Sequence, residues 1–342
     1  MFSFAGKYLY RLISILPSGS ALAVLLLAAS CASVRTGSPF AGAPPAAPGY
    51  TDYRDAIEAL SSGAVPRVQA PESVPAGIDF YDDLTFSEPD GVTLTLDLYV
   101  PAESSAPPPL MLFIHGGGWH QGKKEHTAYY NNYFAQRGYA TASAAYRLSP
   151  EHTFPAAIQD VKCAMVWLKQ HGPEYGFDGS RVVLIGGSAG GHLSLLAGYS
   201  QDPALACPNA PAGSEPEVKG IVNFYGVVDC TTPRAQAAHQ VNDFIGQPYS
   251  EAPDRYALAS PIHHLDANDP PTLTFHGTID ELVPISQADT LHARLDELNV
   301  PNYYDRVEGW HHSMDLAVPL SERFCYVTER FLKRYLPLGS AE

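Results

Sequence analysis

The chain has 342 residues, of which 45% are hydrophobic, 11% aromatic and 17% charged, so its composition excludes an intrinsically disordered protein. Its formal net charge is −15, and its lysines and arginines are scattered along the sequence. From the composition we expect a packed globular protein. Because the net negative charge repels phosphate backbones, we expect no nucleic acid as a partner.

Residues 1–30 have the pattern of a secretory signal peptide. Lys7 and Arg11 precede an apolar run over residues 21–29, which is too short to span a membrane. Cys31 follows small residues in a pattern that resembles the bacterial lipobox, in which the cysteine carries a lipid. We therefore expect an exported protein. It is either an envelope lipoprotein anchored to the membrane at Cys31 or, after ordinary cleavage nearby, a periplasmic or secreted protein.

Residues 31–75 are expected to form a tether and an N-terminal segment. The region is rich in Pro and Ala up to residue 50, and a short helix is expected near residues 53–60. The sequence leaves open whether this region packs on the domain that follows. That domain is expected to cover residues 76–338.

From residue 78 onward, short β-rich runs alternate with amphipathic helical runs, which is typical of a mostly parallel sheet flanked by helices. We expect about eight strands, the first two antiparallel because a short turn at residues 88–91 joins them. The expected strands cover residues 78–86, 92–100, 110–114, 140–146, 182–185, 220–225, 272–275 and 302–307, and the expected helices cover residues 127–137, 156–170, 189–199, 286–298 and 321–335.

Four cysteines lie within the expected domain, and export would place them where disulfides persist. Cys207 and Cys230 lie in loop-like sequence, and we expect this pair to be bonded. Cys163 and Cys325 lie within helical patterns, where we expect buried free thiols.

The run Gly186-Gly187-Ser188-Ala189-Gly190 fits the pattern Gly-x-Ser-x-Gly between an expected strand and an expected helix. A strand, a tight turn and a helix are the setting that exposes a serine hydroxyl as a nucleophile. Such a serine needs a base and an orienting carboxylate. Asp280 follows the strand 272–275 and His312 follows the strand 302–307, in the order expected of a serine hydrolase.

A second glycine-rich run, His115-Gly116-Gly117-Gly118-Trp119, follows the strand 110–114. Successive glycines let backbone N–H groups turn toward one point, which suits the oxyanion of a tetrahedral intermediate. The pairs His263-His264 and His311-His312 lack the His-Glu-x-x-His spacing of a zinc site, so we expect no metal ion.

These runs resemble the α/β-hydrolase superfamily, in the branch of carboxylesterases that includes hormone-sensitive-lipase-like and feruloyl- or acetylxylan-esterase-like enzymes. The resemblance extends over residues 78–336 and also rests on residues 146–160 and 276–284, and it implies an α/β-hydrolase fold. It further implies the following roles: Ser188 as nucleophile, His312 as general base and acid, Asp280 as its orienter, and the N–H groups of Gly117, Gly118 and Ala189 as the oxyanion hole.

The same resemblance matches His312, and not His311, to the catalytic histidine. Arg147 and Asp160 are expected to form a structural ion pair under the oxyanion loop, and Glu281 is expected to be a solvated neighbour of Asp280. Residues 225–265 are expected to form a lid or wall over the substrate pocket.

We therefore expect a carboxylic-ester hydrolase that forms an acyl-enzyme on a small-molecule or polysaccharide-linked ester, without a cofactor. An aryl-formamide or peptide-bond hydrolase that uses the same residues is one alternative. A non-catalytic binding protein with a hydrolase fold is another. The acyl and alcohol preferences and the oligomeric state do not follow from the sequence.

Overall fold

The computed structural model describes residues 38–339, which belong to a compact unit that begins at Ser38. The expected signal peptide and the expected lipid anchor at Cys31 lie outside these residues. Among the described helices, none is both long enough and apolar enough to cross a lipid bilayer.

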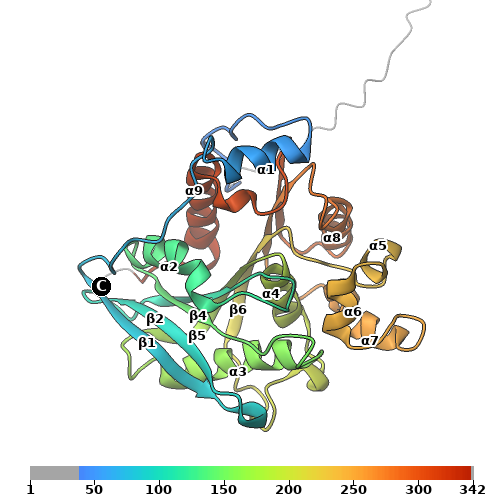
Figure 1. Ribbon diagram of the computed structural model, residues 1–342. Coiled ribbons are helices and arrows are strands. Elements are labelled where there is room, and N and C mark those ends of the chain that lie inside the picture. Colours follow the sequence, from blue (N-terminus) through green and yellow to red (C-terminus); the bar gives the residue numbers. More distant parts are fainter. Residues whose placement is uncertain (1–37, 340–342) are drawn as a thin grey trace, which may run out of the picture. The chain divides into compact units, whose positions relative to one another are not determined.

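The described residues form an eight-stranded sheet (Figure 1), which confirms the expected fold class. The strand order is β1-β2-β4-β3-β5-β6-β7-β8. Strand β2 is antiparallel to β1 and β4, and all other neighbours are parallel. The strands are β1 (Ile78–Ser87), β2 (Leu94–Pro101), β3 (Pro109–Ile114), β4 (Ala140–Ala144), β5 (Asp178–Gly187), β6 (Glu217–Phe224), β7 (Thr272–Gly277) and β8 (Asn302–Val307).

Helices cover both faces of the sheet because successive side chains of a strand point to opposite faces. Leu110 and Leu112 of β3 pack with α3 and α4, whereas Met111 and Phe113 pack with α2 and α9. The α-helices are α1 (Tyr53–Ser61), α2 (Ala128–Ala135), α3 (Ala156–His171), α4 (Ala189–Tyr199), α5 (Pro233–Gln236), α6 (His239–Ile245), α7 (Pro253–Leu258), α8 (Ser286–Glu297) and α9 (Val318–Tyr335). Single turns of 3-10 helix are η1 (Pro89–Gly91), η2 (Lys124–Thr127), η3 (Pro203–Leu205), η4 (Pro261–His264) and η5 (Met314–Leu316).

The long helices lie where the sequence predicted them, but α5, α6 and α7 had no predicted counterpart. They contain four, seven and six residues, respectively. Helices this short do not show the 3.6-residue repeat of apolar side chains over enough turns to be recognised.

Residues 38–68, part of the region for which we expected a tether, are packed against the rest of the unit. The segment before α1 and α1 itself lie beside α9 (Figure 1). The Tyr50 N–H donates a hydrogen bond to the Gly309 carbonyl at 2.6 Å, and Arg67 forms an antiparallel β-bridge with Ala317. A Pro- and Ala-rich composition gives no sign of such long-range contacts, so the sequence left this point open.

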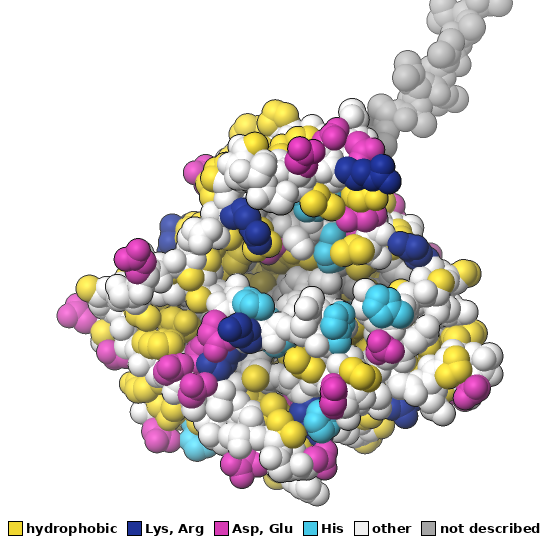
Figure 2. Space-filling model, viewed as in Figure 1, with side chains coloured by type: hydrophobic (Ala, Val, Ile, Leu, Met, Phe, Trp, Pro, Cys, Tyr) yellow, Lys and Arg dark blue, Asp and Glu magenta, His cyan; other side chains and the backbone are white. Residues whose placement is uncertain are grey.

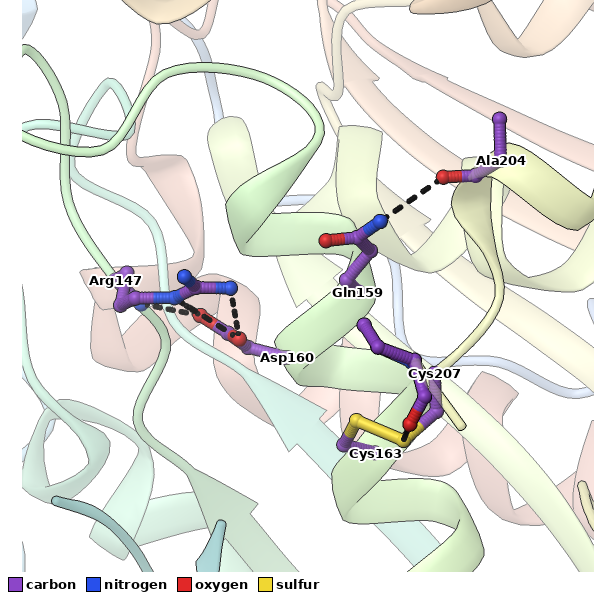
Figure 3. The surroundings of a disulfide bond; sticks show 7 residues. Arg147, Gln159, Asp160, Cys163, Ala204 and Cys207 are labelled. Atoms are coloured by element: carbon purple, nitrogen blue, oxygen red, sulfur yellow. Dashed lines mark hydrogen bonds and ion pairs between the residues drawn. A yellow bond between two sulfur atoms is a disulfide. The ribbon is translucent and has the colours of Figure 1, made fainter. Parts of the chain in front are cut away.

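The expected disulfide between Cys207 and Cys230 was wrong, because Cys207 is bonded to Cys163 (Figure 3). Cys163 lies on α3 one turn after Gln159, whose side chain donates a hydrogen bond to the Ala204 carbonyl. Ala204 and Cys207 belong to the loop that crosses this face of α3. The helical pattern around Cys163 predicted an inward-facing side chain, but it did not reveal that a loop covers that face.

The other two cysteines of the described unit, Cys230 and Cys325, are buried free thiols. Cys325 therefore matches its prediction. Cys230 lies after β6 in the hydrophobic core, and its N–H donates a hydrogen bond to the Ser260 hydroxyl at 2.9 Å. This burial keeps Cys230 away from the loop that contains Cys207.

The expected ion pair between Arg147 and Asp160 is confirmed (Figure 3). Both side chains are buried, and the guanidinium group donates to the two carboxylate oxygens at 2.8 and 2.9 Å. The pair fixes the segment after β4 to α3. In this segment the Tyr146 hydroxyl donates a hydrogen bond to the His115 carbonyl at 2.9 Å, directly before the three glycines.

Candidate active site

The loops that follow the central parallel strands meet at the carboxyl edge of the sheet, where ligands of open α/β sheets bind. They enclose a pocket of about 730 Å³. In Figure 2 this face is hollowed near its centre, and histidine side chains gather around the hollow. The pocket is lined by Gly117 and Gly118 after β3, Ser188 after β5, Tyr225 after β6, and His312 and Asp315 after β8.

Ser188 lies between β5 and α4 in a strained backbone conformation, with φ 56° and ψ −120°. A non-glycine residue at such a φ is held there by its surroundings. Ser188 donates its N–H to the Phe224 carbonyl at 2.9 Å, and its carbonyl accepts the His192 N–H at 2.9 Å. A Cβ atom on Gly190 would lie 2.0 Å from the Ile114 carbonyl oxygen, so only glycine allows α4 to start this close to β3.

Asp280 and His312 are brought together although 32 residues separate them. The His312 Nδ1 lies 2.8 Å from Asp280 Oδ2, and Asp280 Oδ1 accepts the N–H groups of Leu282 and Val283 at 3.0 and 2.9 Å. The Nε2 of His276 donates to the Val283 carbonyl at 2.8 Å and lies 3.3 Å from Asp280 Oδ2.

Burial by itself raises the pKa of Asp280, but hydrogen bonds from His276 and His312 outweigh it and lower the pKa to about 2. Asp280 is therefore ionised at neutral pH. A carboxylate that accepts from Nδ1 leaves Nε2 of His312 as the basic atom of the ring.

The neighbouring His311 has a different environment. Its side chain is buried, its Nε2 has no hydrogen-bond partner within residues 38–339, and burial lowers its pKa. His312, and not His311, forms the hydrogen bond to Asp280 and lines the pocket. Glu281 contributes its carbonyl oxygen to a hydrogen bond from Arg234 at 2.7 Å.

The loop of three glycines is supported from behind by His115. Its ring stacks on Tyr146 with the centroids 4.2 Å apart, and its Nδ1 lies 2.8 Å from the Gly116 carbonyl oxygen. Burial lowers the pKa of His115 to about 4, so this ring is neutral at neutral pH. Within the described chain, the N–H groups of Gly117, Gly118 and Ala189 donate no hydrogen bond.

The side chain of Trp119 is fixed by ring stacking and by a hydrogen bond. Its ring is buried and stacks on Phe244 of α6 with the centroids 4.5 Å apart. Its indole N–H donates to His192 Nδ1 at 3.1 Å, and His192 Nε2 donates to the Ala259 carbonyl at 2.7 Å. Burial lowers the pKa of His192 to about 4, which agrees with a neutral ring that accepts on one nitrogen and donates on the other. These contacts connect the glycine loop to the segment 225–265.

That segment forms a wall of the pocket, as expected. Residues Arg234, Ala237, Ala238, His239, Gln240 and Val241, from α5, α6 and the turn between them, line it. The exposed side chain of Leu282 lies on the same rim.

No motif in the sequence indicated the pair Tyr225 and Asp315. The Tyr225 ring centroid lies 4.4 Å from that of His312, and its hydroxyl donates a hydrogen bond to the Asp315 carboxylate. Burial raises the pKa of Asp315. The positive φ of Tyr225, 40°, is a feature of the backbone that no sequence motif indicated.

The residues that could together ligate a metal ion within the described chain are Asp82, Asp83 and Asp97. Lys124 lies among them, with its Nζ 2.6 Å from Asp97, 3.0 Å from Asp83 and 3.7 Å from Asp82. The ammonium group of Lys124 thus forms ion pairs with all three carboxylates.

The sequence is similar to known esterases. It is 34% identical over 216 residues to the probable carboxylic ester hydrolase LipM of Mycobacterium tuberculosis, which covers 61% of this chain and 50% of LipM. It is 31% identical over 217 residues to the esterase LipC of the same organism, covering 61% of this chain and 54% of LipC. The chain thus spans about half the length of the curated relatives that it matches.

Solved structures show the same fold. The propionate-bound esterase Est2 of Thermogutta terrifontis has a TM-score of 0.66 and 25% identity, and the match covers 80% of this chain and 99% of that one. A truncated carbohydrate esterase from gut microbiota has a TM-score of 0.61 and 24% identity, covering 76% of this chain and 98% of that one.

The BD-FAE family model matches residues 96–295, which is more than half of the chain. The matched range includes the glycine loop, Ser188 and Asp280 and ends before His312. On this match, the chain belongs to the BD-FAE family of α/β-hydrolase esterases.

Proposed function

We propose that the protein is a serine-dependent carboxylic-ester hydrolase in which Ser188, His312 and Asp280 form the catalytic triad. The observation that carries this proposal is the 2.8 Å hydrogen bond between His312 and Asp280 in a pocket that Ser188 also lines. The relatives named as carboxylic ester hydrolases support the same reaction class.

In the first half-reaction, His312 Nε2 takes the proton of the Ser188 hydroxyl while Oγ forms a bond to the ester carbonyl carbon. The charge moves to the carbonyl oxygen, where the free N–H groups of Gly117, Gly118 and Ala189 bind it. The carbon–oxygen bond to the alcohol then breaks, and the imidazolium gives its proton to the leaving alcohol. An acyl group remains on Ser188.

In the second half-reaction, water takes the place of the alcohol. His312 removes a proton from the water, whose oxygen attacks the acyl carbon, and the proton is then returned to Ser188 as the acid leaves. Asp280 keeps the imidazole in the tautomer whose Nε2 is free and stabilises the imidazolium in both steps.

A pocket of about 730 Å³ lies in the range of small-molecule sites, so the substrate is a small ester or the ester-bearing end of a larger molecule. The similarity to an esterase with bound propionate and to a carbohydrate esterase supports short acyl esters, including esters on polysaccharides, as the first substrates to test.

The test is hydrolysis of p-nitrophenyl esters from acetate to decanoate, and of methyl ferulate, by the purified protein and its Ser188→Ala variant. We expect activity that the variant loses by about four to six orders of magnitude. A folded protein whose activity equals that of Ser188→Ala on every ester contradicts the proposal. Activity on an aryl formamide alone would identify the alternative hydrolase.

We also propose that the protein is exported and anchored to a membrane by a lipid on Cys31. The apolar run followed by the lipobox-like residues supports this proposal. The test is labelling with a palmitate analogue in a bacterial host, in which the wild type takes up the label and Cys31→Ser does not. An unlabelled protein recovered from the periplasm or medium would support simple cleavage instead.

A further inference from the structure

The loop that contains His312, residues 308–317, connects β8 to α9, and we name it the histidine loop. We name residues 38–68 the N-terminal strap. Within the described unit, the strap contacts the histidine loop at two places, one before His312 and one after Asp315.

The first contact is a close approach of two backbones. The Tyr50 N–H donates to the Gly309 carbonyl at 2.6 Å. The indole N–H of the buried Trp310 donates to the Ala47 carbonyl at 3.1 Å, and the rings of Tyr50 and Trp310 pack edge to face, 5.6 Å between centroids. A Cβ atom on Gly49 would lie 2.1 Å from the Glu308 carbonyl oxygen, so the approach requires glycine.

The second contact is a short piece of antiparallel β-structure. The Val68 N–H donates to the Leu316 carbonyl and the Val318 N–H donates to the Pro66 carbonyl, both at 2.9 Å. The bridge between Arg67 and Ala317 lies between these two bonds. The strap therefore pairs with the end of the histidine loop immediately before α9 begins.

Each of the two contacts is connected to a residue of the candidate triad through neighbouring residues. On one side, the Trp310 carbonyl accepts the N–H of Ile279, the residue before Asp280, at 3.2 Å. On the other side, Asp315 accepts the hydrogen bond from Tyr225, whose ring lies against that of His312. A shift of the strap would thus move the loops that carry both Asp280 and His312.

We propose that the N-terminal strap is a positioning element of the active site, which holds the histidine loop so that His312 is aligned between Asp280 and Ser188. This inference rests on the proposed esterase function. Residues 47–50 and 66–68 are its positioning residues, and they act through Gly309, Trp310 and Leu316 without touching the substrate.

The test uses the full chain and three variants. Gly49→Val forces the strap away from Glu308, and Trp310→Phe keeps a buried aromatic ring but removes the hydrogen bond to Ala47. Ala46→Val is the matched control, because Ala46 is an exposed strap residue. The measurements are kcat and KM for p-nitrophenyl acetate well below Tm, the pH dependence of kcat/KM, and the low-field proton NMR signal of the His312–Asp280 hydrogen bond.

For Gly49→Val we expect kcat to fall about ten- to a hundredfold with little change in KM, because small misplacements of catalytic groups cost this much. The low-field signal should weaken and the acidic limb of the pH profile should shift. Trp310→Phe should show the same changes at smaller size, and Ala46→Val should match the wild type. A purely structural strap would lower Tm and leave kcat, the pH profile and the NMR signal unchanged.

A folded Gly49→Val with wild-type kcat and an intact low-field signal overturns the inference. If Gly49→Val does not fold, Trp310→Phe decides by the same criteria. If the wild type shows no activity that Ser188→Ala removes, the proposed function fails. The low-field signal then still reports whether the strap aligns His312 with Asp280.

Discussion

The tight turn at residues 186–190, which joins β5 to α4 and which we name the elbow, and the histidine loop are held in place by different kinds of contact. The elbow is encoded locally, because residues 186–190 lie between a strand and a helix and the glycines allow close packing. The histidine loop depends on residues far away in the sequence, such as Ala47, which is separated from Trp310 by 263 residues. The proposed nucleophile can therefore be recognised from a short motif, whereas the alignment of the proposed base depends on the whole fold.

Substitution of His312 by alanine is expected to have the largest effect, and the same substitution of its neighbour His311 is the control. His312→Ala should lower kcat/KM by about four orders of magnitude or more, because it removes the proposed proton acceptor for Ser188. His311→Ala should lower it less than about tenfold, since His311 has no hydrogen bond to Asp280. Steady-state kinetics on one ester measures both, and equal losses would show that the histidine has been assigned incorrectly.

Gly190→Ala tests whether the turn at Ser188 depends on the close packing that its glycines allow. The added methyl group would collide with the Ile114 carbonyl oxygen, so we expect a loss of about 3 kcal/mol in the free energy of unfolding, together with a lower kcat. Urea denaturation and kinetics measure the two effects. Wild-type values for both would mean that the elbow does not depend on this close approach.

Removal of the disulfide should change stability without changing catalysis, because neither Cys163 nor Cys207 lines the pocket. The cystine closes a loop with a sequence separation of 44, so Cys163→Ser is expected to cost about 4 kcal/mol or less. Chemical denaturation with and without a reductant should show this loss in the wild type and no further loss in the variant. A large fall in kcat of Cys163→Ser, measured well below Tm, would show that catalysis does depend on the disulfide.

The pKa of Asp280 predicts a smaller, pH-dependent effect. Its folded value of about 2 lies below the ordinary 3.8, so the contribution to stability is fully present above about pH 4 and is lost as the pH falls toward 2. The difference corresponds to about 2 kcal/mol. Between pH 5 and pH 3, the wild type should lose more stability in urea than Asp280→Asn, and parallel losses would contradict this linkage.

The sequence predicted those parts of the molecule that depend on local patterns. Strand and helix periodicity predicted the strands along the chain and a mostly parallel sheet, but not the order in which the strands pair. Short motifs predicted Ser188, Asp280 and His312, of which the last two are hydrogen bonded. The partner of Cys207 could not be predicted, because a loop crossing a helix face leaves no local pattern.

The contacts of the strap and the pair Tyr225 and Asp315 were missed for a similar reason. They depend on a β-bridge, on backbone carbonyls and on a positive φ, none of which is marked by a local sequence motif. Only the three-dimensional arrangement shows that these groups surround the histidine.

The most direct test of the account is to identify the residue that becomes acylated. The protein is mixed with p-nitrophenyl acetate, quenched in acid within the first turnover and digested for mass spectrometry. We predict an acetyl group on the peptide that contains Ser188 in the wild type and none in Ser188→Ala. An acetyl group on another residue that persists in Ser188→Ala while ester turnover continues would contradict the central claim.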